Sequence, residues 1–333
     1  MRRVYVLAVL LPLAFAPIAK SQDTKPQDPK KDPDQIGNRD VSRGVNFYSI
    51  EKEMALGKAM SEQVERQAKL LDDKVITEYV NRLGQNLARN SDTKIPLTIK
   101  VIDSKELNAV TLPGGYIYVD TGLIRMAQSE AELAAALAHE IAHVAARHGT
   151  RQATQTEIAQ VATIPLIFLG GVSGICWRTA GAAGVVPIGL LAAQRSFEAE
   201  ADTLGLQYLY KSGYDPLGMV DIFEKLFSFD ERKHGRIAQV FSDHPVYGLR
   251  LVNVQKNIET MLKEKPEYVL NTSEFDDIKA RLAFLDWNPK PEPPPDRERP
   301  TLKRKGDQLI ASKKLVPEPN ARASQIKEAY TVK

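Results

Sequence analysis

One segment, residues 130–148, constrains the fold more strongly than any other part of the chain. It is filled with alanine and leucine and is preceded by Ser129, with Glu132 three residues later, which is the Ser-x-x-Glu pattern of a capped helix start. Gly149 follows at a position typical of a helix end. The pattern therefore predicts a single long helix from Glu130 to His148.

The interior of this predicted helix carries the pattern His-Glu-x-x-His, at His139, Glu140 and His143. Residues four apart lie one turn apart on the same helix face, so both imidazoles can reach one metal ion while Glu140 lies beside a metal-bound water. Bound zinc lowers the pKa of its water to roughly 7, and a neighbouring carboxylate can take the remaining proton. The pattern predicts metal-assisted hydrolysis with Glu140 as general base. Two solvated histidines on a polar helix face are the alternative interpretation.

A third ligand is expected from another segment, because catalytic zinc usually takes three protein ligands and leaves a fourth position open. In QRSFEAEADTLG, Glu198 and Asp202 are four apart and share a helix face. Glu200 points roughly 200° away from Glu198 on the same helix. We therefore expect Glu198 to be the third ligand and Asp202 to accept a hydrogen bond from the outer nitrogen of a ligand imidazole. An acidic, solvated helix face is the alternative.

The other hydrophobic patterns predict a mainly helical α+β domain with a small sheet. Helical spacing of apolar residues indicates helices over residues 49–71 and 73–88, and a further long helix from about 197 to 211. Alternation near 97–101, and the run GGYIYV at 114–119, predict two strands. No repeat with a period of about 34 or 40 residues is visible, so we expect a catalytic domain without a helical repeat array.

Both ends of the chain differ from this domain in composition. Residues 1–21 begin with two arginines, continue with an apolar run and contain an Ala-x-Ala pattern, which predicts a secretory signal peptide. The apolar run is shorter than the roughly 20 residues that span a bilayer, and a retained membrane anchor is the alternative. Residues 22–45 predict a flexible linker, and residues 286–333 a Pro-rich, charged tail. The folded domain is expected over residues 46–285.

Charge and cysteine content exclude some classes of protein. The net charge of +3 falls to +1 without Arg2 and Arg3, so no basic excess indicates a nucleic-acid partner. Cys176 is the single cysteine, which excludes a disulfide within the chain and a lipid-anchoring cysteine behind the apolar run. Together with the signal pattern, this predicts an exported protein that is periplasmic or secreted.

Residues 158–194 have the least ordinary composition. Apart from Arg178 this stretch carries no charge, and it separates the two segments that hold the predicted ligands. Its length would allow one membrane span, but Pro165, Pro187 and several glycines interrupt it. We expect an apolar lid or cleft wall beside the metal site, formed by two packed half-helices or a mobile hairpin. Peripheral contact with a membrane surface and true insertion are the alternatives.

Four segments carry a more specific pattern. They are LNAVTLPGGYIYVDTGLI from Leu107, LAHEIAHVAARH from Leu137, RSFEAEADTLGLQYLYKSGYDP from Arg195 and SDHPVYGLRL from Ser242. In order and spacing they resemble zinc metallopeptidase family 48, which includes the CAAX prenyl endopeptidases, the HtpX quality-control peptidases and soluble periplasmic members. The resemblance implies a gluzincin fold whose small sheet binds extended substrate at its edge strand. We expect one zinc ion per subunit.

The resemblance also assigns roles residue by residue. His139 and His143 match the family's ligand pair, and Glu140 matches its general base. Glu198 matches the third ligand, and Asp202 matches the acid that supports the ligands. These assignments agree with those made above from spacing alone.

Three further residues match positions near the reacting group of relatives. Asn108 and His244 fall where relatives place residues close to the scissile carbonyl, and His244 would donate to the oxyanion or close over the zinc as a fourth ligand. Arg250 matches the arginine that ends the family's His-Pro motif and would orient these groups. A turn residue for Asn108 and a surface loop histidine for His244 are the alternatives.

Gly114, Gly115, Tyr116 and Ile117 are predicted to bind substrate by strand addition, in which an extended peptide pairs with an open sheet edge. An ordinary internal hairpin is the alternative. An open sheet edge that binds extended peptides prefers unfolded chains. The sequence therefore predicts a zinc endopeptidase acting on misfolded or unassembled exported proteins. The alternatives are a periplasmic chaperone or assembly factor with vestigial or tightly gated protease activity, and a structural zinc domain. Glu140 favours the enzyme, since structural zinc has no use for a general base.

Overall fold

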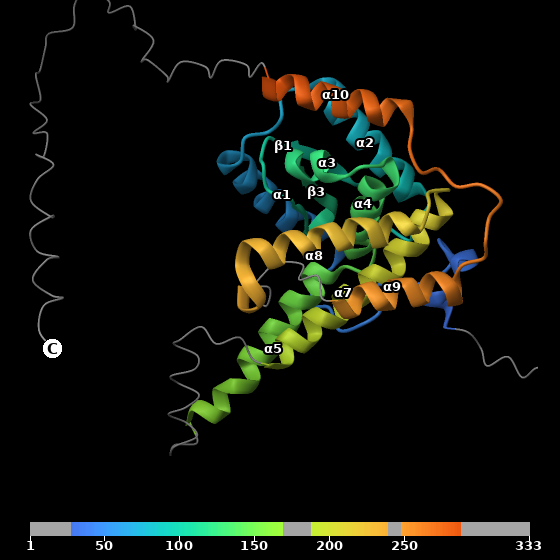
Figure 1. Ribbon diagram of the computed structural model, residues 1–333. Coiled ribbons are helices and arrows are strands. Elements are labelled where there is room, and N and C mark those ends of the chain that lie inside the picture. The colour runs from blue at the N-terminus through green and yellow to red at the C-terminus, as the bar shows by residue number, and fades with distance from the viewer. Residues whose placement is uncertain (1–27, 169–187, 239–247, 288–333) are drawn as a thin grey trace, which may run out of the picture. The chain divides into compact units, whose positions relative to one another are not determined.

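Figure 1 shows the computed structural model of the chain, which describes residues 28–168, 188–238 and 248–287. All described residues belong to one compact unit, the first of two into which the chain divides at Asn288. The predicted signal peptide and His244 therefore lie outside the described residues, as does nearly all of the predicted tail.

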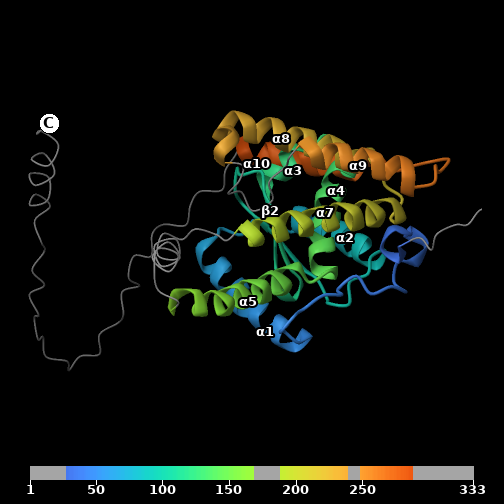
Figure 2. The ribbon, with the colours of Figure 1, turned by 90° about the horizontal axis from the view of Figure 1, so that it is seen from below.

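The first unit is mainly helical, and the predicted α+β class is confirmed. Its described helices are α1 (Ile50–Gln67), α2 (Lys74–Arg89), α3 (Thr121–Met126), α4 (Glu130–Ala145), α5 (His148–Phe168), α7 (Ile188–Lys211), α8 (Leu217–Ala238), α9 (Gly248–Met261) and α10 (Ser273–Trp287), with 3-10 turns η1 (Pro29–Lys31), η2 (Pro33–Gln35) and η3 (Pro113–Gly115). Every residue of α4 is buried, and this helix contacts α2, α7, α8 and the sheet. Figure 2 shows α8 and α9 on one side of α7 and α5 on the other. The helix with the His-Glu-x-x-His pattern is thus the central helix of the fold.

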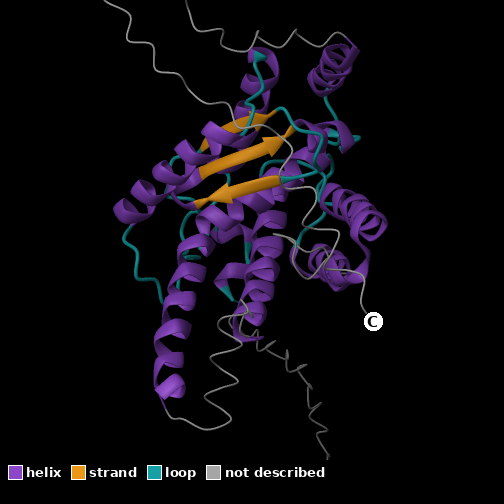
Figure 3. Cartoon of the chain, turned by 90° about the vertical axis from the view of Figure 1, so that its left-hand side faces the viewer, coloured by secondary structure: helices purple, strands orange, loops and turns teal. Residues whose placement is uncertain are grey.

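The sheet has three strands, shown side by side in Figure 3: β1 (Thr98–Ile102), β2 (Ala109–Leu112) and β3 (Tyr116–Asp120). Their order is β1-β3-β2, with β1 parallel and β2 antiparallel to β3. The prediction that substrate adds as a strand at Tyr116 and Ile117 is therefore wrong, because β3 already pairs with a strand on each side. Within the described part of the chain, β2 is the strand next to α4 that lies at an edge of the sheet. It was not predicted because four residues are too few to show a clear alternation.

Helix α4 starts as predicted but ends earlier. The Ser129 side chain accepts from the Glu132 backbone N–H, which caps the first turn. The helix ends at Ala145, and Arg147 has a φ of 55°, a left-handed conformation that is costly for a non-glycine residue. Arg147 is held there by Glu53 at 2.6 Å and by the Tyr48 carbonyl at 2.7 Å. The predicted continuation to His148 with a glycine cap is wrong, because these contacts turn the chain and start α5 at His148.

Residues 28–45 pack against the domain, so the prediction of a flexible linker at 22–45 is wrong for this part. Arg39 is buried and donates to Asp92 at 2.9 Å and to Gln207 of α7 at 2.8 Å. Val41 is also buried in the core. This packing was not predicted because Arg39 and Val41 stand in a Pro- and Lys-rich segment whose few apolar residues show no periodicity.

The apolar stretch at 158–194 is described at its two ends. Helix α5 continues through Pro165 to Phe168, so this proline does not break the helix as expected, and α7 begins at Ile188. Residues 169–187 lie outside the described residues, and the expected lid or cleft wall stays a prediction. Among the described helices, none combines the length and the apolar character that a membrane span requires.

Helices α4 and α7 approach closely at Gly205. A Cβ atom built on Gly205 would lie 3.0 Å from the carbonyl oxygen of Ala138 and 3.0 Å from both Cα and N of His139. These are backbone atoms of α4, which cannot rotate out of the way. The absence of a side chain at residue 205 therefore sets the distance between the two helices.

We expect Gly205→Ala to destabilise the protein by about 1–3 kcal/mol, as overpacking of a tight core does. For a domain of this size each kcal/mol lowers Tm by about 2–4 °C. The matched control is Gly248→Ala, at the start of α9, because a Cβ there meets no atom of the described residues within 4 Å. Thermal unfolding followed by circular dichroism checks both, and an unchanged Tm for Gly205→Ala would contradict the close approach.

Candidate metal centre and its supports

Helices α4 and α7 bring three candidate ligands together. His139 and His143 project from α4 and Glu198 from α7, and all three are buried. Nε2 of His139 lies 3.1 Å from Nε2 of His143. Glu198 places Oε2 at 3.4 Å from Nε2 of His139 and Oε1 at 3.5 Å from Nε2 of His143. The structure thus brings together the three residues that the sequence predicted as ligands.

These separations lie within about 0.2 Å of those expected around a tetrahedral zinc ion. Zinc binds imidazole nitrogen and carboxylate oxygen at about 2.0–2.2 Å, which places neighbouring ligand atoms about 3.3–3.5 Å apart. Two imidazoles and one carboxylate also form a donor set found in catalytic zinc sites, where the fourth position stays open for water or substrate. Both the distances and the donor chemistry therefore suit zinc.

Asp202 and Arg250 support this group from one side. Oδ1 of Asp202 lies 3.1 Å from Nδ1 of His139. Arg250 of α9 donates to both Asp202 oxygens, at 2.8 and 2.6 Å, and its Nη1 lies 3.0 Å from Oε2 of Glu198. Burial alone would raise the pKa of Asp202, but the charge and hydrogen bonds of Arg250 and the contact with His139 lower it. Asp202 is therefore an anion that orients the outer nitrogen of His139.

The electrostatics of the group favour a cation. Burial opposes a positive charge on His139, yet its contacts with Asp202 and Glu198 raise its pKa to about 9. Phe223 of α8 closes the site from another direction, with its ring edge-on to His139 at 5.9 Å and under the Arg250 guanidinium at 4.8 Å. Buried carboxylates beside an aromatic wall attract positive charge more strongly than the same groups in water.

Glu140, the predicted general base, is tied to strand β2. Thr111 donates from Oγ1 to Oε2 of Glu140 at 2.7 Å, and the same hydroxyl lies 3.2 Å from the backbone oxygen of Glu140. Thr111 was not predicted because a threonine in a strand is ordinary, and its place within LNAVTLPGG was the only signal. The contact fixes the carboxylate relative to the sheet.

His148, for which the sequence predicted no role, contacts a candidate ligand. Its Nδ1 lies 3.0 Å from Nδ1 of His143, and its Nε2 lies 3.1 Å from Oε2 of Glu200. Glu200 also accepts from Arg151 at 3.0 Å and from Lys30 at 2.5 Å. Burial alone would raise the pKa of Glu200, but these three donors lower it to about 2. The prediction that Glu200 points away from the ligand face of α7 agrees with these contacts.

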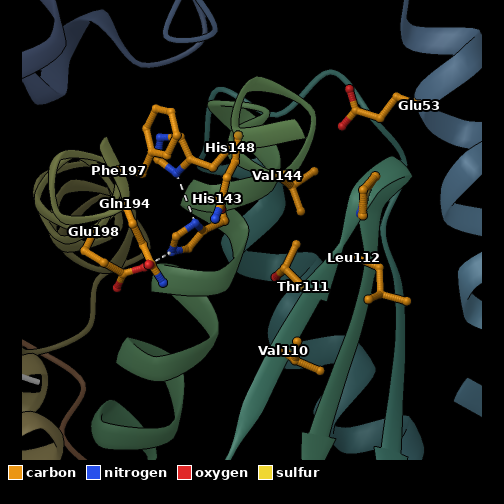
Figure 4. A pocket seen from close by; sticks show the side chains of 13 residues that line it. Glu53, Val110, Thr111, Leu112, His143, Val144, His148, Gln194, Phe197 and Glu198 are labelled. Atoms are coloured by element: carbon orange, nitrogen blue, oxygen red, sulfur yellow. Dashed lines mark hydrogen bonds and ion pairs between the residues drawn. The ribbon is translucent and has the colours of Figure 1, made fainter. Parts of the chain in front are cut away.

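A cleft of about 200 Å³ lies between β2 and α7, beside these groups (Figure 4). The side chains that line it include those of Val110, Thr111, Leu112, His143, Phe197 and Glu198. In Figure 4 the strand residues face the cleft from one side and Phe197 and Glu198 from the other, with His143 between them. An extended chain placed along β2 would therefore pass in front of His143 and Glu198.

The remaining predicted residues lie at the ends of β2. Asn108 directly precedes β2, and its carbonyl accepts from the Asp120 N–H at 3.0 Å. Gly114 and Gly115 form the turn between β2 and β3 with φ values of 75° and 86°, which few other residues adopt. The roles predicted for Asn108 and for His244 at the scissile carbonyl stay predictions.

Comparison with known proteins agrees with the resemblance stated above. Residues 75–258, more than half of the chain, match Peptidase family M48. The beta-barrel assembly-enhancing protease of Escherichia coli K12 is 31% identical over 260 residues, which cover 76% of this chain and 52% of that protein. Metalloprotease LoiP of the same organism is 32% identical over 186 residues, which cover 55% of this chain and 69% of that protein.

A third relative extends the match along the chain. The beta-barrel assembly-enhancing protease of Yersinia pestis is 30% identical over 286 residues, which cover 82% of this chain and 56% of that protein. The chain thus spans about half the length of the beta-barrel assembly-enhancing proteases that it matches. The family match and the buried group of two histidines and one glutamate lead to the same conclusion. The chain belongs to peptidase family M48.

Proposed function

We propose that the protein is a zinc-dependent endopeptidase with one zinc ion per subunit. The observation that carries this proposal is the spacing of the ligand atoms of His139, His143 and Glu198, between 3.1 and 3.5 Å, with Glu140 on the same helix. A zinc ion held there would polarise a substrate carbonyl and lower the pKa of water to roughly 7. A structural site would not need the acidic side chain of Glu140 beside it.

The side chains around the metal centre would each have a distinct role in peptide hydrolysis. Glu140 takes the proton of the attacking water and passes it to the leaving amine, as a general base and then a general acid. The Thr111 hydroxyl, 2.7 Å from Oε2 of Glu140, holds this carboxylate in one orientation. Asp202 and Arg250 keep His139 and Glu198 in place. These ligand side chains therefore need not move during the reaction.

The open side of β2 supports binding of an extended peptide. The Asp120 N–H donates to the Asn108 carbonyl, and hydrogen-bonded pairs alternate along an antiparallel ladder. The peptide groups of Val110 and Leu112 therefore point to β3, and those of Ala109 and Thr111 point away from it. A substrate strand would pair with Ala109 and Thr111, next to Glu140. This arrangement supports unfolded polypeptides as substrates, since a folded protein rarely offers a free strand.

We further propose that these substrates are misfolded or unassembled exported proteins. Support comes from the signal-like pattern at residues 1–21 and from relatives named beta-barrel assembly-enhancing proteases. On this basis we place the protein in the periplasm or outside the cell. Peripheral membrane contact through residues 158–194 stays a prediction.

Glu140→Gln tests the catalytic assignment. We expect the variant to retain stoichiometric zinc, because the three ligands are unchanged, and to lose at least about 10²-fold in the rate of casein degradation, because the general base is absent. Metal analysis and a proteolysis assay measure the two properties on the same sample. Undiminished turnover would overturn the mechanism. If the wild type binds zinc but degrades no unfolded protein, a chaperone or assembly factor becomes the better proposal.

Thr111→Val tests the link between the base and the substrate strand. The change removes one hydroxyl and leaves the backbone of β2 intact, so we expect kcat to fall about 10-fold, the value of a hydrogen bond to a charged group, with KM nearly unchanged. Thr156→Val is the control, because the Thr156 hydroxyl bonds only within its own helix, to the Gln152 carbonyl, among the described contacts. Steady-state kinetics on an unstructured peptide separates the two constants. A change in KM alone would place Thr111 in substrate binding instead.

A further inference from the structure

A second line of contacts runs from Glu200 through His148 to the candidate ligand His143. It does not involve Asp202. Nε2 of His143 faces His139 and Glu198, so a metal bound there requires the ring proton of His143 to be on Nδ1. Nδ1 of His148, 3.0 Å away, must then accept the hydrogen bond. The proton of His148 is consequently on Nε2, which donates to Glu200 at 3.1 Å. One tautomer of each ring satisfies every contact in this line.

Glu200 and His148 are each held in place by further contacts. The Glu200 carboxylate accepts from Lys30 through Oε1 and from Arg151 through Oε2. The His148 ring is 2% exposed and stacks on Phe197, with ring centroids 4.7 Å apart and planes inclined by 25°. Both the position and the rotation of the His148 ring are therefore determined by its neighbours.

The bend between α4 and α5 makes the contact with His143 possible. In a continuous helix, residues five apart would lie roughly 140° apart around the axis, so His148 could not face His143. The left-handed conformation of Arg147 breaks the helix between them, and Glu53, which is 2% exposed, stabilises it through the ion pair at 2.6 Å. The backbone thus adopts a costly conformation that brings the two imidazoles together.

We propose that His148 and Glu200 are positioning residues that hold the imidazole of His143 in its metal-binding orientation. This inference rests on the proposed zinc site. Asp202 orients His139 in one step, whereas Glu200 lies on the other side of α7 and acts on His143 through the His148 ring. Lys30 extends the same line into residues 28–45, so the N-terminal segment stabilises the metal centre as well as the fold.

The test is the rate at which zinc leaves the purified full-length protein when a chromogenic chelator is added at fixed pH. His148→Phe keeps a flat ring to stack on Phe197 but removes the acceptor for His143. We expect this variant to release zinc about 10- to 100-fold faster than the wild type, in line with other supports of metal-binding histidines. Glu200→Gln weakens the outer hydrogen bond only, so its release should accelerate by a smaller factor.

A double variant distinguishes positioning from simple loss of stability. If Glu200 acts through His148, adding Glu200→Gln to His148→Phe should not accelerate zinc release further, whereas independent structural effects would multiply. Glu132→Gln is the matched control, because Glu132 is a buried carboxylate of α4 that pairs with Lys225 at 2.6 Å, away from the ligands. The Glu132→Gln variant should have a lower Tm and an unchanged rate of zinc release. The visible spectrum of the cobalt-substituted protein should change with His148→Phe and not with Glu132→Gln.

The outcomes separate this inference from the proposed function. A wild type that fails to bind one zinc ion per chain would overturn the proposed function. A wild type that binds zinc, with His148→Phe and Glu200→Gln releasing it at the wild-type rate, would overturn the positioning role alone. Should His148→Phe fail to fold, Glu200→Gln still decides, because its release must be faster than that of Glu132→Gln.

Discussion

The close contact between α4 and α7 is the constraint on which the whole site depends. Ligand atoms on two different helices must lie within about 3.5 Å of one another, and side chains of fixed length can do this only at one helix separation. Glu198, Asp202 and Gly205 follow the i, i+4, i+7 spacing, so they form one stripe on α7. Gly205 lets the backbones approach, and the two acidic residues of the same stripe then meet the imidazoles of α4.

Much of this arrangement could be predicted because it depends on spacing within single helices. The positions of His139, Glu140 and His143 follow from one turn of α4, and those of Glu198 and Asp202 from one turn of α7. The support from Arg250, which belongs to a third helix, came from the family resemblance and not from periodicity. Tertiary packing brings α4, α7 and α9 together. The spacing of residues within a helix does not predict how helices pack.

The residues that could not be predicted depend on irregular backbone or on contacts between distant parts of the chain. His148 would have been assigned a place on α4 far from His143 as long as the helix was expected to continue, and nothing in Ala-Arg-His-Gly indicates a left-handed arginine. Thr111 became recognisable only when β2 was known to be an edge strand next to Glu140. Lys30 and Arg39 act across more than 160 residues of sequence, to Glu200 and Gln207, and no local pattern predicts such contacts.

The distribution of these contacts along the chain has a consequence for how the protein matures. Chains are made from the N-terminus, and the centre draws on residues from Lys30 to Arg250. A chain completed only to the end of α7 would hold both imidazoles and Glu198, but it would lack the Arg250 guanidinium that offsets the charge of Glu198 and Asp202. The charge balance of the metal centre is therefore completed only when α9, close to the end of the folded domain, has been made.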